Sequence, residues 1–500
     1  MDVPRGTSGK HPPPIPKAYM TQHIVDQAYI NGAWVTADSG DTFPVTDPAS
    51  GAVIAHVPNM GAAETERAIT AAADAFPAWR ACPATTRAAL LRRLFERINE
   101  TAEALAILLT RENGKPLAEA RGEIRYGASF VSWFSEEARR VYGDLIPASR
   151  TDRRLMVSRE PVGVCALITP WNFPSAMITR KMAAALAAGC TVVIKPAEDT
   201  PLSALALAAL CQEVGFPPGV VNVVTTREPA AVGGAMCDDL RVRKLSFTGS
   251  TAVGRMLMAM CAPSLKRVSL ELGGSAPFIV FEDADISAAV DGAMASKFRN
   301  NGQTCVASNR FLVHADVVDD FAARLAERVR ALREGHGLDD GTDVGPMISE
   351  FGKDKVRRLL EDAKQKGATL VCGTIPAEEN ADLFVQPVVL TGVSQEMSLW
   401  EEEIFGPVVA IRTFSSEQQA VEMANETDYG LAAYFYTRDL SRSWRVREGL
   451  RFGMIGVNTG MISTAQAPFG GINQSGMGRE GSRYGIEEYL NLKYTCVGIE

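Results

Sequence analysis

Short apolar runs rich in β-branched residues alternate with helical segments through the middle of the chain, and this alternation constrains the fold more than any other feature. The run "VGVCALITP" (162–170) precedes "AMITRKMAAALAAG" (176–189), and "TVVIKP" (191–196) precedes "LSALALAALCQEVG" (202–215). Strand–helix–strand alternation of this kind predicts a parallel sheet covered by helices on both faces. We therefore expect an α/β fold.

The same pattern begins again after Gly273. The apolar run "APFIVF" (276–281) is followed by a predicted helix over 286–298, the strand-like "RFLVH" (310–314) and a predicted helix over 317–334. Because a chain of 500 residues is too long for a single hydrophobic core, we expect this restart to be a second α/β domain.

Composition excludes several classes of partner. The formal charge is −8, from 51 Lys and Arg against 59 Asp and Glu, and no basic stripe occurs, so neither nucleic acid nor an anionic membrane is expected as a partner. Nine scattered cysteines and five histidines show no ligand spacing, which predicts no disulfide framework and no metal site. The N-terminal stretch lacks the apolar segment of a secretory signal, and the longest apolar run, 182–194, is too short to span a bilayer. We expect a cytoplasmic protein.

One cysteine stands in an unusual setting, the polar stretch "NNGQTCVASNR" (300–310). Structural cysteines usually pack among apolar neighbours, whereas Cys305 is flanked by amide and hydroxyl side chains. A cysteine is nucleophilic as the thiolate, which nearby backbone N–H groups or a helix N-terminus favour. The setting predicts that Cys305 is a nucleophile.

Two polar residues at strand ends are suited to work with such a nucleophile. In "ITPWNFP" (168–174) the two prolines fix the backbone, so Asn172 is either a rigid donor to a developing oxyanion or a helix cap. In "SLELGGSAP" (269–277) Glu271 is either a base with a raised pKa or a carboxylate satisfied by backbone amides.

Two further strand ends are suited to bind a nucleotide. Lys195 and Glu198 follow a buried strand, where they hold ribose hydroxyls or form a solvated pair of surface charges. The turn Gly249–Gly254 aims backbone N–H groups at a phosphate or is an ordinary strand–helix turn. Its Arg255-Met256 replaces the Lys-Ser/Thr of a P-loop, which argues against nucleoside triphosphate hydrolysis.

Taken together and in this order, the motifs resemble those of the aldehyde dehydrogenase superfamily, over residues 28 to 498. They are "TPWNFP", "IKPAE", "FTGSTAVG", "LELGG", "GQTC", "EEIFGPV" and "APFGG". Longer stretches such as "ASKFRNNGQTC" and "GREGSRYGIEEYLNLKY" are similar to the succinate-semialdehyde dehydrogenase branch.

The resemblance implies a Rossmann-type cofactor domain, a second α/β catalytic domain and a β-strand oligomerisation extension. The expected boundaries are a disordered lead-in at 1–25, an NAD-binding domain at 26–148 and 164–272, a catalytic domain at 273–465, and oligomerisation strands at 149–163 and 484–500. Strands outside the main sheets fit a homodimer and a homotetramer equally well.

The resemblance also implies a division of labour at the catalytic centre. Cys305 would attack the aldehyde carbon to give a thiohemiacetal, Asn172 and the Cys305 backbone N–H would hold the oxyanion, and Glu271 would activate the water that hydrolyses the resulting thioester. Water activation by Glu271 argues against a coenzyme A-acylating enzyme. A non-catalytic binding or structural member is disfavoured because the nucleophile and the base are both present.

For the cofactor, the resemblance assigns contacts with each part of NAD, with NADP as the alternative. The assigned residues are Trp171, Lys195 and Glu198 for the adenosine, Gly249, Ser250 and Gly254 for the diphosphate, and Glu403 and Phe405 for the nicotinamide ribose. A carboxylate beside the adenine ribose accepts hydrogen bonds from its hydroxyls and repels a 2′-phosphate, so Glu198 predicts a preference for NAD.

For the substrate, the branch assigns Arg180, Arg299 and Ser463 to the far carboxylate of succinate semialdehyde. Arginine suits this role because its guanidinium binds a carboxylate with two hydrogen bonds, although both arginines also fit ordinary surface positions. Glutarate semialdehyde and another ω-carboxylated or aliphatic aldehyde stay open, since one methylene changes discrimination by only about 1–3 kcal/mol.

Overall fold

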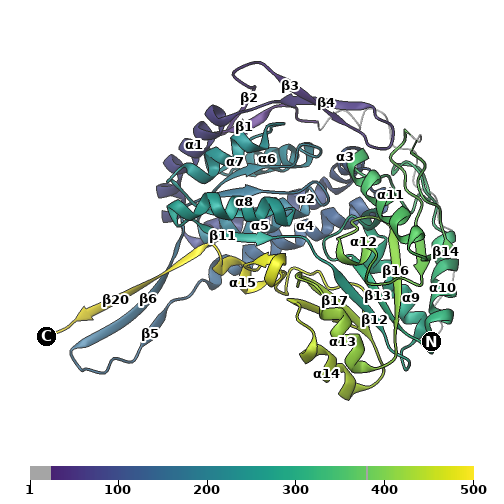
Figure 1. Ribbon diagram of the computed structural model, residues 1–500. Helices are drawn as coiled ribbons and strands as arrows, with labels where there is room; N and C mark the ends of the chain where they lie inside the picture. Colours follow the sequence, from purple (N-terminus) through teal and green to yellow (C-terminus); the bar gives the residue numbers. More distant parts are fainter. Residues whose placement is uncertain (1–23, 379–380) are drawn as a thin grey trace, which may run out of the picture.

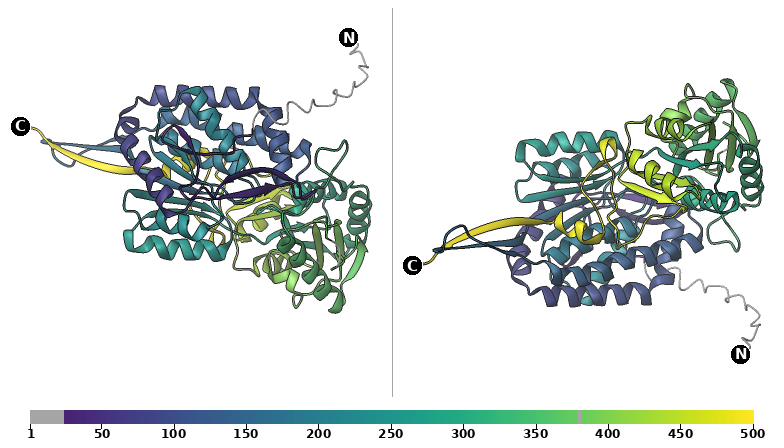
Figure 2. Two further views of the ribbon diagram at one scale, coloured as in Figure 1. Left: turned by 90° about the horizontal axis from the view of Figure 1, so that it is seen from above. Right: turned by 90° about the horizontal axis from the view of Figure 1, so that it is seen from below.

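The structure is a computed structural model that describes residues 24–378 and 381–500. Two β-sheets lie side by side, each covered by helices, and a narrow ribbon of strands projects from the first (Figures 1 and 2). Residues 1–23 of the expected lead-in at 1–25 lie outside the described residues. Its last two residues, Ile24 and Val25, are partly buried against the hydrophobic core around the first sheet.

The first sheet has eight strands, and the five in its middle are parallel. In spatial order the strands are β19 (Gly476–Met477), β11 (Arg267–Glu271), β10 (Val242–Thr248), β7 (Val164–Ile168), β8 (Thr191–Lys195), β9 (Val221–Val223), β1 (Ala28–Ile30) and β2 (Ala33–Val35). The parallel centre and its connecting helices agree with the predicted Rossmann-type alternation. The antiparallel edge strand β19 comes from the C-terminal part of the chain, which the sequence did not indicate.

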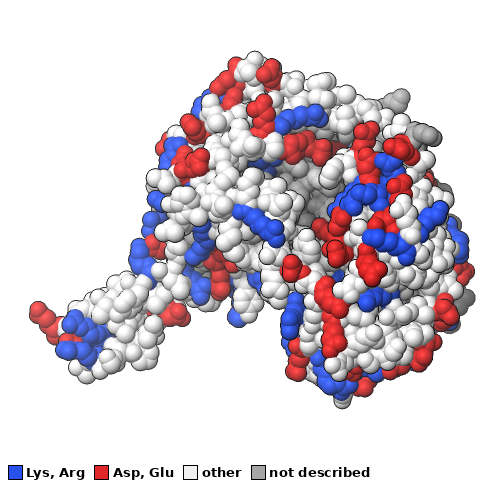
Figure 3. Space-filling view, in the orientation of Figure 1, with Lys and Arg blue, Asp and Glu red and all other residues white. Residues whose placement is uncertain are grey.

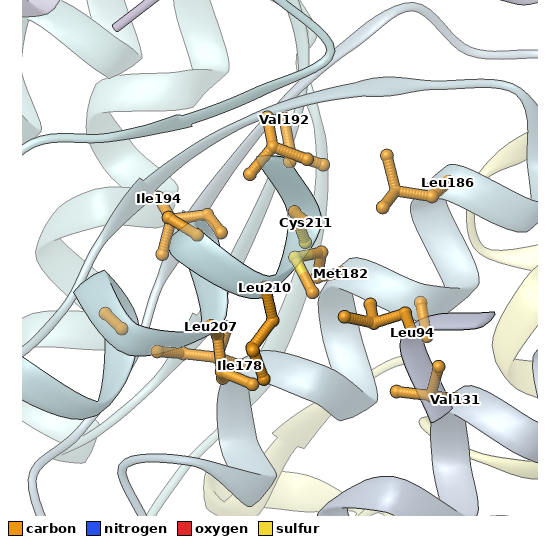
Figure 4. Packing of buried hydrophobic residues seen from close by; sticks show 14 of the residues in the cluster. Leu94, Val131, Ile178, Met182, Leu186, Val192, Ile194, Leu207, Leu210 and Cys211 are labelled. Atoms are coloured by element: carbon orange, nitrogen blue, oxygen red, sulfur yellow. The ribbon is translucent and has the colours of Figure 1, made fainter. Parts of the chain in front are cut away.

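Helices cover both faces of this sheet. One face carries α1 (Ala62–Ala81), α7 (Pro229–Asp238) and α8 (Thr251–Cys261), and the other carries α2 (Ala84–Glu100), α3 (Ala102–Asn113), α4 (Leu117–Glu137), α5 (Ala176–Ala188) and α6 (Leu202–Val214). Because successive side chains of a strand point to opposite faces, Val192 and Ile194 of β8 belong to the second layer, whereas Val193 belongs to the first. Figure 4 shows Val192 and Ile194 among residues of α5 and α6.

The second sheet is built in the same way. In spatial order its strands are β14 (Thr369–Cys372), β15 (Val388–Thr391), β16 (Val408–Phe414), β13 (Ser308–His314), β12 (Ala276–Val280), β17 (Ala432–Tyr436) and β18 (Met454–Val457). All pairings are parallel except that of β14 with β15. Its helices are α9 (Ile286–Lys297), α10 (Val318–Arg330), α11 (Glu350–Gln365), α12 (Ser398–Glu401), α13 (Glu417–Asn425) and α14 (Leu440–Gly449). The predicted second α/β unit is therefore present.

The projecting ribbon is a three-stranded sheet of β20 (Leu490–Gly498), β6 (Arg153–Pro161) and β5 (Asp144–Ile146). β20 runs antiparallel to β6 along nine residue pairs, from Leu490 opposite Pro161 to Gly498 opposite Arg153. β6 and β20 were expected as strands outside the main domains, whereas β5 was not anticipated. Short elements complete the described part of the chain: a hairpin of β3 (Thr42–Thr46) and β4 (Val53–Pro58), helix α15 (Ser482–Glu487), and 3₁₀ turns at 138–140, 262–264, 299–302 and 473–475.

Acidic and basic side chains are interspersed over the face of the molecule seen in Figure 3. Within residues 24–378 and 381–500, no helix combines the length and the apolar character needed to cross a membrane. The described part of the chain also contains no group of three or more His, Cys, Asp or Glu side chains arranged to hold a metal ion.

Candidate active site

A single cavity collects the loops that follow β7, β10 and β11 and the loops that precede β13 and β16. The carboxyl ends of parallel strands are the usual ligand-binding edge of an α/β sheet, which explains why the first three loops meet there. Asn172, Glu271 and Cys305 all line this cavity, together with Glu403 and Phe405. The structure thus brings together the three residues expected at the catalytic centre.

The loop before Cys305 has an unusual backbone. Asn300 and Asn301 adopt left-handed conformations with φ of 51° and 53°, which asparagine tolerates better than most residues. Gly302 follows with φ of 74°, and a Cβ there would lie 2.2 Å from the Gly406 carbonyl oxygen. The Gln303 side chain donates to the Asn300 carbonyl and accepts from the Ile348 N–H at 3.0 Å. The polar residues of this stretch therefore hold Cys305 in place.

Asn172 is rigidly held beside that loop. It is 3% exposed, and its side-chain Nδ2 donates to the Gln303 carbonyl at 3.0 Å. An amide nitrogen carries two hydrogens, so one stays available for a ligand oxygen. The side-chain oxygen of Asn172 has no hydrogen-bond partner among the described residues. Asn172 is therefore a fixed donor inside the cavity, as an oxyanion site requires.

Cys305 is a neutral thiol rather than a thiolate. Burial raises its pKa to about 12, and the positive charges of Arg180 and Arg299 only partly oppose that shift. This shift favours the thiol over the thiolate, because removal from water penalises the charged form. The thiol must give its proton to a base when it attacks.

Glu271 is one of two carboxyl groups that line this cavity with Cys305, and Glu403 is the other. It is 2% exposed, and neither carboxyl oxygen has a hydrogen-bond partner among the described residues. Burial, followed by the nearby Glu480 carboxylate, raises the pKa of Glu271 well above its ordinary value. The backbone makes room for it at Gly470, where φ is 154° and a Cβ would lie 2.9 Å from Glu271 Oε1. The alternative that backbone amides satisfy Glu271 is excluded.

A second cavity extends from the first, between α7 and α8, and suits an adenosine group. Val253, Met256 and Met260 form one apolar wall, and Lys195 and Glu198 stand at the rim. The Lys195 ammonium pairs with Glu198 Oε1 at 2.7 Å, so the two are partners rather than independent surface charges. Trp171, Gly249 and Ser250 line both cavities, so one extended dinucleotide fits across the pair.

The turn between β10 and α8 is shaped for close approach of the backbone. A Cβ at Gly254 would lie 2.5 Å from Leu272, so the glycine lets the helix sit directly on the sheet. Ser250 caps α8 by accepting a hydrogen bond from the Val253 N–H at 3.4 Å. Backbone N–H groups at the N-terminus of α8 consequently face the floor of the cavity. N–H groups at a helix N-terminus favour the binding of a phosphate.

Glu403 and Phe405 complete the cofactor side. Glu403 Oε1 accepts a hydrogen bond from the Gly274 N–H at 2.9 Å, and burial raises its pKa. Phe405 adopts φ of 54° and meets the Trp171 ring edge-on, with 5.6 Å between ring centres. Both residues thus line the cavity that contains Cys305.

The three residues expected to bind the substrate carboxylate differ in burial and in whether they already have an ion-pair partner. Arg180 is 2% exposed, forms an ion pair with Glu480 through Nε, and stacks on Phe469 with 4.2 Å from its guanidinium carbon to the ring centre. Arg299 is half-buried over Phe173, and no ion pair is present for it within the described residues. Ser463 is half-buried in the loop after β18. Arg299 is therefore the free cation, whereas Arg180 already has an anionic partner.

Several buried charges beside the site were not found from the sequence. Glu480 joins Arg180 and Lys181, and Lys115 pairs with Glu123 at 2.6 Å with both side chains almost fully buried. In the sequence, each of these residues resembles an ordinary surface charge. Only the charged residues within the apolar "MITRKMAAALAAG" gave a local hint, since such a stretch has no exposed face for them.

Comparisons with known proteins agree with this geometry. The sequence model described as "Aldehyde dehydrogenase family" matches residues 34–495. The chain is 55% identical over 473 residues to a glutarate-semialdehyde dehydrogenase of Pseudomonas putida KT2440, covering 95% of this chain and 98% of that protein. It is 54% identical over 473 residues to the succinate-semialdehyde dehydrogenase [NADP(+)] of Escherichia coli K12, covering 95% and 98%. A crystal structure of succinate-semialdehyde dehydrogenase from Burkholderia pseudomallei superimposes with a TM-score of 0.94 at 54% identity, covering 96% and 99%.

Proposed function

Because the chain belongs to the aldehyde dehydrogenase family, we propose that it oxidises succinate semialdehyde to succinate with NAD(P) as the hydride acceptor. The observation that carries the proposal is the presence of Cys305, Asn172 and an unpartnered Glu271 in one cavity. These groups supply a nucleophile, an oxyanion donor and a base, which together with a hydride acceptor suffice for oxidation of an aldehyde through a covalent intermediate.

The residues act in sequence on the aldehyde. Cys305 Sγ attacks the carbonyl carbon and loses its proton to the Glu271 carboxylate, giving a thiohemiacetal whose oxyanion is held by Asn172 Nδ2 and the Cys305 N–H. NAD(P), when bound, supplies the acceptor for the hydride that leaves the same carbon. Glu271 then releases the thiol proton to solvent and, as the carboxylate again, deprotonates the water molecule that hydrolyses the thioester. The Cys305 thiolate leaves as the acid forms and takes the proton back from Glu271. Burial raises the pKa of Glu271, which makes its carboxylate a stronger base for this task.

Within the NAD(P) dependence of the family, we propose a preference for NAD. Glu198 stands at the rim of the adenosine cavity with 31% of its side chain exposed and its charge facing Lys195. A 2′-phosphate placed there would meet the carboxylate, whereas ribose hydroxyls would donate hydrogen bonds to it. The ratio of kcat/KM for NAD and NADP measures the preference directly, and a higher value for NADP would overturn it.

The free guanidinium of Arg299 and the Ser463 hydroxyl support a substrate with an anionic far end. Arg180 contributes a second positive charge, although Glu480 already occupies its Nε edge. Glutarate semialdehyde is the second candidate, because the relative of that activity is as similar to the chain as the succinate-semialdehyde dehydrogenase is. The two substrates differ by one methylene, so relative kcat/KM decides between them.

The projecting ribbon supports a homodimer or a homotetramer. β20 and β5 form its two edges, and large apolar side chains on it are open to solvent: Leu145 is 82% exposed, Leu492 70% and Tyr494 60%. An exposed edge strand that carries apolar residues is a template for pairing with another chain. Light scattering coupled to size-exclusion chromatography gives the mass, and a monomer of 53.8 kDa would refute the proposal.

The function is tested by following NAD(P) reduction with succinate semialdehyde, glutarate semialdehyde and butanal. We expect kcat/KM for succinate semialdehyde to exceed that for butanal by about tenfold or more, as a charge-assisted contact predicts. Equal values for these two aldehydes would leave the oxidation chemistry intact and refute the proposed substrate class. A lead for glutarate semialdehyde would favour the second candidate.

A further inference from the structure

The region from Asn113 at the end of α3 to Glu123 in the second turn of α4 carries buried charges that the proposed mechanism does not use. Lys115 is 1% exposed and Glu123 is 3% exposed, although both residue types normally face water. A buried ion pair gives little net stability, since the desolvation of both charges offsets their attraction. The contacts that Lys115 and Glu123 make with neighbouring groups therefore indicate the role of the pair.

The Lys115 ammonium makes three contacts around the loop that carries Asn172. It donates to Glu123 Oε2 at 2.6 Å and to the Asn172 carbonyl oxygen at 2.8 Å, and it lies 4.0 Å from the centre of the Phe173 ring. Glu123 Oε1 in turn accepts hydrogen bonds from the Ser175 and Ala176 N–H groups, at 2.9 and 3.2 Å. The pair thus fixes the peptide of Asn172 from one side and the start of α5 from the other.

The same segment also reaches the loop of the nucleophile. Glu119 Oε2 accepts a hydrogen bond from the Asn300 N–H at 2.7 Å, and Asn300 Nδ2 donates to the Asn172 carbonyl at 2.9 Å. The Asn172 carbonyl therefore receives two donors, Lys115 and Asn300, while its own side chain donates to Gln303. Asn113 Nδ2 adds a hydrogen bond to the Trp171 carbonyl at 2.9 Å.

These contacts determine the orientation of the Asn172 side-chain amide, which is the proposed oxyanion donor. An amide contributes to catalysis only if its N–H points at the place where negative charge develops, and an error of about 1 Å costs roughly 10²-fold. The Lys115 contact with the carbonyl fixes the plane of the Asn172–Phe173 peptide, and hence the direction in which the Asn172 side chain leaves the backbone.

We propose that Lys115, neutralised by Glu123, is a positioning residue that orients Asn172 for oxyanion stabilisation. The inference rests on the proposed function and deepens it. A pair that merely ties α4 to α5 would change stability alone, whereas a positioning pair changes the rate through Asn172.

The test is a double-mutant cycle. Replacing Lys115 alone would leave the Glu123 charge buried and unpaired, so the variant is Lys115→Met combined with Glu123→Gln, which removes both charges and keeps similar volume. This pair is introduced into the unaltered enzyme and into an Asn172→Ala background. Arg87→Met is the matched control, because Arg87 is a buried cation that donates to the Ala187 carbonyl at the other end of α5.

We expect the charge-free pair to lower kcat by about tenfold or more in the unaltered enzyme and by less than about twofold in the Asn172→Ala background. The Kd for NAD and the KM for the aldehyde should change less than kcat does, and Arg87→Met should lower the melting temperature without lowering kcat. Equal losses of kcat in both backgrounds, or a loss matched by Arg87→Met, would overturn the proposal. Failure of the proposed function would look different: the unaltered enzyme would reduce NAD(P) with none of the aldehydes, and the role of Lys115 would fall with it.

Discussion

Replacing Arg299 by methionine removes the cation that we propose binds the substrate carboxylate, and it keeps most of the side chain. The guanidinium of Arg299 stacks on Phe173 at 5.1 Å, and within the described residues it forms no ion pair, although its charge opposes the upward pKa shift that burial imposes on Glu119 and on Cys305. Methionine retains an unbranched apolar stem, which preserves packing on the ring. The change therefore isolates the charge from the packing.

The expected magnitude follows from the exposure of the group. A hydrogen bond to a charged group contributes roughly 1.5–3 kcal/mol, and because Arg299 is half-buried we take the lower value, about 1.5 kcal/mol. That free energy corresponds to about a tenfold loss in kcat/KM for succinate semialdehyde. Butanal has a chain of the same length without the carboxylate, so its kcat/KM should fall by less than about twofold.

The assay is initial-rate NAD reduction with both aldehydes at saturating cofactor, using the parent enzyme and Arg299→Met. The decisive quantity is the ratio of kcat/KM for succinate semialdehyde to that for butanal, because effects on folding or on the nucleophile cancel in it. An unchanged ratio would refute the reasoning, since it would mean that Arg299 does not meet the carboxylate.

Four further predictions concern the neighbouring groups. Arg180→Ala should raise KM for succinate semialdehyde more than for butanal, and equal KM changes would count against a role in carboxylate binding. Calorimetry should also record a loss in unfolding free energy that is smaller than the roughly 3–5 kcal/mol of a buried charge left unpaired, because Lys181 still pairs with Glu480. The rate should rise with pH through the neutral and alkaline range, because burial raises the pKa of Glu271 and only its deprotonated form accepts a proton; a flat profile that Glu271→Gln leaves unaltered would contradict this. Gly470→Ala should lower kcat while the Kd for NAD stays constant, because the added alanine Cβ would lie 2.9 Å from Glu271 Oε1 at a φ of 154°. Full activity of this variant would show that the added Cβ does not crowd Glu271. Glu198→Ser should narrow the difference in kcat/KM between NAD and NADP by removing the carboxylate from the adenosine rim, and an unchanged ratio would remove Glu198 from the selectivity argument.

Much of the architecture follows from patterns local in sequence. The alternation of apolar runs and helical segments predicted both parallel sheets, because strand and helix periodicities are set by residues close together in the chain. The motif residues Asn172, Glu271 and Cys305 were likewise identifiable, since each follows or precedes a strand and the ends of parallel strands meet at one edge. Strands β5 and β19 were missed because they are three and two residues long, too short for a period to register.

The ion pairs and pKa shifts of the candidate site depend on the tertiary structure. Lys115 and the Asn172 carbonyl are 57 residues apart in the chain, and Lys181 and Glu480 are 299 apart, so no window of sequence relates them. The thiol state of Cys305 and the raised pKa of Glu271 also depend on burial by distant segments, which the local sequence does not encode. The sequence determined which chemical groups the site contains. Folding determined the protonation states of these groups, their hydrogen-bond and ion-pair partners, and their orientation. Desolvation and Coulomb interactions act through space, whereas backbone propensities act along the chain.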